Sequence, residues 1–114
     1  MAIKISSSAA RMTVYLSGEI DHHNAAVIRF ETDEAIQASH PPCVRIDFSG
    51  VTFMDSSGIG FVMGRYRLVN VYGGKTEVVG LSERLYSMMK LAGLERLVKL
   101  EKKQEKGKNN ETVK

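Results

Sequence analysis

The segment Val51-Thr52-Phe53-Met54-Asp55-Ser56-Ser57-Gly58-Ile59-Gly60 contains the change from strand to helix on which the fold depends. Before it, Val44, Ile46 and Phe48 alternate with polar residues, a period of two that is typical of a strand with one buried face. After it, the apolar residues at 59, 62, 63, 66 and 69 follow one face of a helix. The sequence therefore predicts that two adjacent serines lie at a strand-to-helix junction.

Similar patterns extend in both directions along the chain. Further strands are expected at residues 3–5, 12–16, 78–79 and 97–100, where apolar and polar side chains alternate or the apolar run is short. A helix is expected from the cap residue Asp21 to about Ser39, and another from Ser82 to Gly93. The side chains expected to face the core from the first of these helices are Val27, Phe30, Ala35 and Ala38.

The order of these elements, strand-strand-helix-strand-helix-strand-helix-strand, predicts an α/β fold. Strands that alternate with helices form a largely parallel sheet through helical crossovers. Because the strands alternate in polarity instead of being apolar throughout, we expect the helices mainly on one face of the sheet. Residues 1–100 form the expected domain, and residues 101–114 are expected to form a charged, disordered tail.

Composition excludes several functional classes. The formal net charge of +3 includes five lysines and three glutamates in the last fourteen residues, so the first hundred residues are nearly neutral and do not suggest nucleic-acid binding. Cys43 is the only cysteine, which precludes an intrachain disulfide and suits a reducing compartment. The sequence contains no apolar stretch of roughly 20 residues, the length that spans a membrane. We expect a cytoplasmic, monomeric protein.

Residues for catalysis are scarce. The chain lacks a Gly-x-Ser-x-Gly elbow, and His22 and His23 have no partners at metal-ligand spacing. We expect no catalytic residue, metal or cofactor. The glycines at Gly58, Gly60 and Gly64 are spaced one residue wider than a dinucleotide-binding loop, which leaves a nucleotide-binding domain as an alternative. They also fit a helical stripe that lets another surface approach closely.

The segment Asp55-Ser56-Ser57-Gly58 is the remaining candidate site. Backbone N–H groups at a helix N-terminus are unpaired and the helix dipole is positive there, so anions are favoured. A phosphorylated serine at this position would add roughly −1.5 to −2 charges, which a docking partner would sense. A serine that only caps the helix fits the same pattern. The local chemistry leaves both interpretations open.

The full segment, continued by Met63-Gly64-Arg65-Tyr66, closely resembles the phosphorylation segment of STAS-domain anti-sigma factor antagonists, and most of all their sporulation branch. Gly18-Glu19-Ile20-Asp21-His22-His23, Gly73-Gly74 and Leu81-Ser82-Glu83-Arg84-Leu85 agree with this family in order and spacing. The resemblance covers nearly the whole chain except the tail. It implies a mixed sheet with helices on one face.

The resemblance also implies a mechanism. Ser56 is expected to accept phosphate from ATP held by an anti-sigma factor that is itself a serine kinase, and a PP2C-type phosphatase is expected to remove it. The unphosphorylated form would bind the kinase and release its sigma factor. The implied partner surface comprises Asp21, Asp55, Ser57, Gly58, Ile59 and Gly60. A related regulator of a stress or other signalling kinase remains the alternative within the family.

Overall fold

A computed structural model describes residues 2–104 of the chain. Five strands form one sheet in the order of the sequence: β1 (Ala2–Ser7), β2 (Met12–Ile20), β3 (Cys43–Met54), β4 (Lys75–Leu81) and β5 (Lys99–Lys102). β1 pairs antiparallel with β2, and the other neighbouring pairs are parallel. The expected mixed, largely parallel sheet is confirmed.

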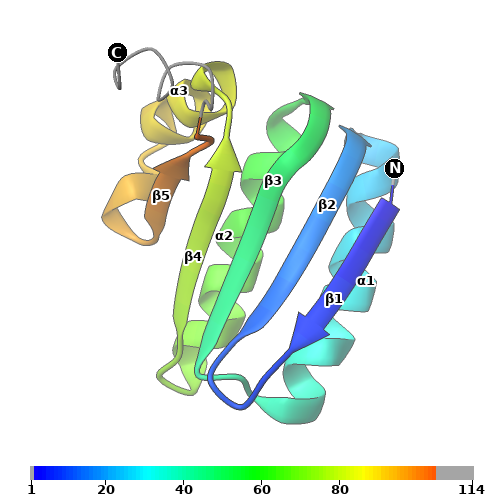
Figure 1. Cartoon of the computed structure of the whole chain (residues 1–114), viewed down its shortest axis with the longest axis vertical. Coiled ribbons are helices and arrows are strands. Elements are labelled where there is room, and N and C mark those ends of the chain that lie inside the picture. Colours follow the sequence, from blue (N-terminus) through cyan, green and yellow to red (C-terminus); the bar gives the residue numbers. More distant parts are fainter. Residues whose placement is uncertain (1, 105–114) are drawn as a thin grey trace, which may run out of the picture.

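The helices are α1 (His22–Ser39), α2 (Ser56–Val71) and α3 (Glu83–Leu91), followed by the short 3-10 helix η1 (Leu94–Arg96). Figure 1 shows α1 and α2 side by side behind the sheet, with the strands β1 to β4 in front of them. Within residues 2–104, no helix lies over the centre of the opposite face of the sheet, and Tyr15 of β2 is 43% exposed there. The helices therefore lie mainly on one face, as the alternation of the strands predicted.

The alternating residues of the strands form the core. Met12, Val14 and Leu16 of β2 are buried, and so are the side chains of β3 that follow the same alternation, Val44, Ile46 and Phe48. Each residue of these sets points to the helix-covered face because side chains alternate across a strand. The strand periodicity in the sequence was therefore sufficient to find this part of the core.

The buried face of α1 differs from the expected one. Ile28, Thr32 and Ile36 are buried, whereas Val27 is 49% exposed and Phe30 is 63% exposed. The true face contains a polar residue, and the Thr32 hydroxyl donates a hydrogen bond of 2.6 Å to the Ile28 carbonyl one turn earlier. Because this local bond satisfies the hydroxyl, threonine can lie in the core, which a search for apolar residues does not detect.

The buried face of α2 was found in part. Val62 and Val69 are buried as expected, and residues 59, 63 and 66 are half-buried. Phe61 and Arg65, which were not expected in the core, are 3% and 5% exposed. This face therefore includes a charged side chain, whose partner is described below.

The C-terminal strand is displaced from its expected position. β5 covers Lys99–Lys102 instead of residues 97–100, because the N–H groups of Leu97 and Val98 still donate hydrogen bonds of 2.9 and 3.0 Å to the Leu94 carbonyl of η1. Two residues of the expected tail, Glu101 and Lys102, thus belong to the sheet. The expected disorder of residues 105–114 lies outside the described residues.

Candidate functional site

The N-termini of α1 and α2 meet at one edge of the sheet. β2 and β3 are parallel and adjacent, so the helices that follow them begin at the same end. The Asp55 N–H group donates a hydrogen bond of 3.1 Å to the Ile20 carbonyl. This bond links the residue that follows β3 to the last residue of β2. Two helix starts that are 34 residues apart in the sequence therefore form one local surface.

Each helix is capped by an aspartate. The Asp21 carboxylate accepts a hydrogen bond of 2.9 Å from the Asn24 N–H, and the Asp55 carboxylate accepts one of 2.8 Å from the Ser57 N–H. The Ser57 backbone N–H lowers the pKa of Asp55 below its ordinary value, and the backbone N–H and charge of His22 act in the same direction. Since Asp55 is the cap of α2, neither serine has that role.

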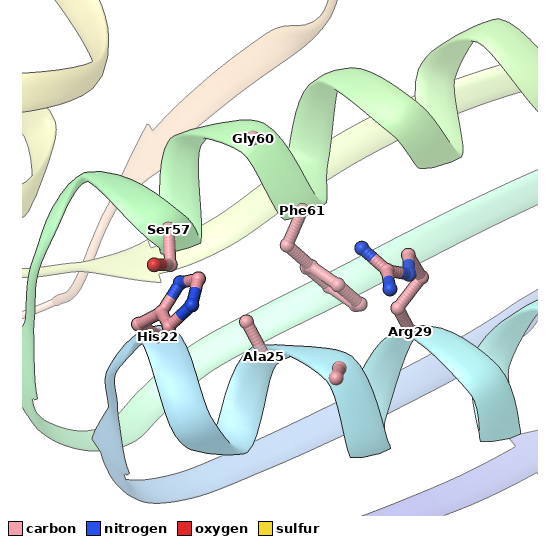
Figure 2. Close-up of a pocket in the computed structure, with 7 residues that line it drawn as sticks. His22, Ala25, Arg29, Ser57, Gly60 and Phe61 are labelled. Carbon is pink, nitrogen blue, oxygen red and sulfur yellow. The ribbon is translucent and has the colours of Figure 1, made fainter.

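The two serines differ in position. Ser56 is the first residue of α2 and is exposed, whereas Ser57 is half-buried. Figure 2 shows the Ser57 side chain on the side of α2 that faces α1, next to the ring of His22. The Ser56 side chain is therefore more accessible from solvent than that of Ser57.

A groove of about 460 Å³ separates the two helix starts. Figure 2 shows His22 and Arg29 projecting from α1, and Ser57 and Phe61 from α2. The lining is completed by small residues, and the full set is His22, Ala25, Ala26, Arg29, Ser57, Gly60 and Phe61. The groove is apolar in its middle and polar at its ends, a combination that suits a side chain of a partner protein.

The glycines of α2 have unlike surroundings. A Cβ atom at Gly58 would collide with Sδ and Cγ of the buried Met54, so this glycine allows the helix to pack against the end of β3. A Cβ atom at Gly60 or Gly64 would meet no atom within 4 Å in the part of the chain that the structure describes. Packing therefore explains Gly58, which is buried. We assign this glycine to the fold instead of the partner surface. Packing does not explain the other two.

The same run of glycines lies entirely inside α2. A dinucleotide or phosphate loop needs glycines in a loop before the helix, where the backbone can wrap around phosphates. The helical position removes the observation that supported a nucleotide-binding domain, and it agrees with a flat helical stripe.

An ion pair holds α1 against α2 below the groove. Arg65 Nε lies 2.8 Å from Asp33 Oδ1, and the Arg65 guanidinium carbon lies 5.0 Å from the centre of the Phe61 ring. Burial of Arg65 lowers the pKa of its guanidinium, and the Asp33 charge opposes this shift. The pair links α1 to α2 and lies beside Phe61, which lines the groove.

The sequence interpretation missed several of the groove residues. His22 was considered as a metal ligand and not as a groove residue, and Ala25, Arg29 and Phe61 were not selected. The sequence did contain an indication of a groove, because Ala25 and Ala26 of α1 are small and Gly60 of α2 is smaller still. Only the parallel pairing of β2 with β3 brings these small residues opposite each other, and that pairing cannot be deduced from the residues themselves.

The residues given above do not form a metal centre. Within residues 2–104, no group of three or more histidine, cysteine, aspartate or glutamate side chains could hold a metal ion. No helix in the same range is long and apolar enough to cross a membrane.

The chain belongs to the STAS domain family, whose sequence pattern it matches over residues 1–107. The match covers β1 through β5 together with the two helix starts that form the site. The five-stranded mixed sheet and three helices described above are the same architecture that solved members of the family show.

Among individual proteins, the chain is similar to antagonists of anti-sigma factors. It is 37% identical to the anti-sigma F factor antagonist of Paenibacillus polymyxa over 83 residues, 73% of this chain and 71% of that protein. It is 33% identical to the anti-sigma-B factor antagonist of Bacillus subtilis over 94 residues, 82% and 84% of the two chains.

Solved structures of anti-sigma factor antagonists are also similar to this chain. The chain is similar to the anti-sigma factor antagonist SpoIIAA in its unphosphorylated form, with a TM-score of 0.77 and 26% identity over 98% of this chain and 96% of that chain. It is also similar to the phosphorylated form of SpoIIAA from Bacillus, with a TM-score of 0.71 and 26% identity over 99% and 100% of the two chains.

Proposed function

We propose that this protein is an anti-sigma factor antagonist that is switched off by phosphorylation of Ser56. In its unphosphorylated form it binds an anti-sigma factor with serine kinase activity, which then releases its sigma factor. The protein is a substrate and binding partner, and not itself an enzyme. The observation that carries the proposal is an exposed serine at the first position of α2, beside a groove that the fold leaves open.

The surroundings of Ser56 support a switch that acts directly on the partner. The Asp55 carboxylate already accepts the Ser57 N–H, so a nearby N–H group that could hold a phosphate is occupied. The same carboxylate repels a second negative charge. A phosphate of roughly −1.5 to −2 charges at Ser56 would therefore gain little from the protein's own helix and would present its charge to the partner.

The partner surface that we propose consists of the two capped helix starts and the groove between them. Asp21 and Asp55 provide negative charge, Ile59 provides a half-buried apolar side chain, and Gly60 allows close approach. Ser57 lines the groove from the side of α2. A PP2C-type phosphatase completes the cycle by removing the phosphate from the exposed Ser56.

Titration calorimetry with the purified, ADP-bound anti-sigma factor tests this proposal. The Ser56→Ala variant should bind within about threefold of the wild type, whereas Ser56→Asp should bind at least about tenfold more weakly, a loss of ~1.4 kcal/mol. Ser87→Asp places the same charge on an exposed position of α3 and serves as the matched control. Equal affinities of the Ser56→Asp and Ser87→Asp variants would contradict the charge mechanism.

A second candidate lies within the same family. The 33% identity to an anti-sigma-B factor antagonist spans more residues than the 37% identity to an anti-sigma F factor antagonist. A stress or other signalling kinase is therefore the alternative partner. Pull-down of the source organism's own anti-sigma factors with the Ser56→Ala variant, repeated with Ser56→Asp, distinguishes the two, because only the cognate partner should be lost in the second experiment.

A further inference from the structure

A second groove lies near the opposite end of α2 from Ser56. Its volume is about 540 Å³, a size typical of small-molecule sites. Asn70 is fourteen residues beyond Ser56, which separates the two regions by about 20 Å along the helix axis. The groove is lined by Tyr66, Asn70, Gly74, Lys75, Thr76, Glu77, Leu97 and Lys99.

The groove exists because two neighbouring strands differ in length. β5 pairs with β4 only from Glu77 onward, through the register Glu77 to Lys99. The first two residues of β4, Lys75 and Thr76, pair with β3 on one side and have no strand partner in the described chain on the other. The sheet therefore has a step at this point, with α2 above it.

The charges that line the groove are unevenly compensated. Glu77 is already paired, since its carboxylate lies 3.0 Å from Arg45 Nε. Lys75 and Lys99 take part in none of the ion pairs formed within residues 2–104. Two ammonium groups thus remain available beside one neutralised carboxylate, which makes the groove attractive to an anion.

Thr76 adds an independent observation. It is only 5% exposed, and its hydroxyl has no hydrogen-bond partner within the described residues. An unpaired buried hydroxyl is unfavourable, in contrast to that of Thr32, which is satisfied inside α1. Rotation about the Cα–Cβ bond exchanges the positions of the hydroxyl and the methyl group, so the hydroxyl can turn toward a ligand in the groove.

We propose that this groove binds a small dianion carrying carboxylate or phosphate groups. Lys75 and Lys99 neutralise its charge, and Thr76 and Asn70 donate hydrogen bonds to its oxygens. The Tyr66 ring and Leu97 contact its carbon skeleton. The site is separate from the Ser56 surface, so it does not depend on the proposed phosphorylation.

Amide chemical shifts of the full-length protein, measured during separate titrations with succinate and with inorganic phosphate, test the proposal. At least one of the two anions should cause saturable shifts at Asn70, Gly74 and Thr76, and the comparison identifies the preferred acidic group. The uncharged succinamide should cause none. Absence of saturable shifts with both anions would overturn the proposal.

Variants then assign the binding to these side chains. The double variant Lys75→Gln/Lys99→Gln should bind at least about tenfold more weakly. Lys4→Gln/Lys90→Gln removes the same charge from exposed positions elsewhere and should bind like the wild type. Thr76→Val should lose about threefold or more in affinity while unfolding at no lower temperature, because it removes an unpaired hydroxyl. Equal affinities of the two double variants would show general charge attraction and would contradict the site.

Discussion

The packed face and the open face of α2 differ in what explains their residues. On the packed face, which comprises Gly58, Phe61, Val62, Arg65 and Val69, each residue is buried. On the open face, which comprises Ser56, Gly60 and Gly64 at spacings of four, the glycines leave space that no other described atom fills. A glycine inside a helix costs up to about 1 kcal/mol relative to alanine. A glycine that lowers stability without a packing reason and that also lines the groove, as Gly60 does, indicates where a partner binds.

The largest effect is expected at Arg65 on the packed face. Arg65→Ala leaves Asp33 without its partner between the helices, and we expect a loss of about 3 kcal/mol in the free energy of unfolding. The value lies at the lower end of the range for broken buried pairs because the Asp33 side chain is 31% exposed. Urea unfolding measures it. Arg67→Ala, on the exposed side of the same helix, should change stability by less than about 0.5 kcal/mol, and equal losses in both variants would contradict the packed role of Arg65.

Gly58→Ala should have the next largest effect. The added methyl group forces the buried Met54 side chain to move, at a cost of about 1–3 kcal/mol. The higher helix propensity of alanine offsets up to about 1 kcal/mol of this cost. We expect a net loss of about 1–2 kcal/mol in the free energy of unfolding, measured by urea denaturation. A variant as stable as the wild type would remove the packing explanation for this glycine.

Gly60→Ala should have the opposite sign. No described atom opposes the new methyl group, so the free energy of unfolding should rise by up to about 1 kcal/mol. Because Gly60 lines the groove, the same change should weaken binding to the anti-sigma factor. Gly64→Ala is the matched control, since it should stabilise the helix similarly but does not line the groove. If both variants kept full affinity, the groove would not be part of the partner surface.

The smallest expected effect concerns Asp55 and pH. The folded protein lowers the pKa of this carboxyl, so its stabilising contribution is fully present above the ordinary aspartate pKa and is lost as the pH falls through the lowered value. The Asp55→Asn variant should therefore be less stable than the wild type at pH 7, and the difference should shrink below about pH 4. Thermal unfolding at both pH values measures this. A difference that stays constant over this range would contradict the charge-based capping of α2.

The comparison also shows which parts of the fold the sequence could predict. The first four strands and the helix caps Asp21 and Ser82 were confirmed because alternation and capping are local, whereas the last strand begins two residues later than expected. The packed face of α1 was predicted only in part: Ala35 packs against the core as expected, but the face also includes Thr32 and excludes Phe30. The position of Arg65 was missed for a related reason, because a charged residue enters the core only when a distant partner such as Asp33 is present.

The candidate site also has features that depend on neighbouring residues and features that depend on distant ones. The strand-to-helix junction at Asp55 and Ser56 was predicted from neighbouring residues, and the resemblance to the family singled out Ser56. The structure replaces the possible serine cap with Asp55 and leaves Ser56 exposed. The groove between α1 and α2 depends on residues at least 28 positions apart, such as Arg29 and Ser57, so only the tertiary structure could reveal it.

Phosphopeptide mass spectrometry after incubation with the cognate anti-sigma factor and ATP tests the central claim most directly. We predict phosphate on Ser56 in the wild type and in the Ser57→Ala variant, and no phosphate in the Ser56→Ala variant. Phosphate on Ser57 alone, or on neither serine, would contradict the assignment of Ser56 as the switch.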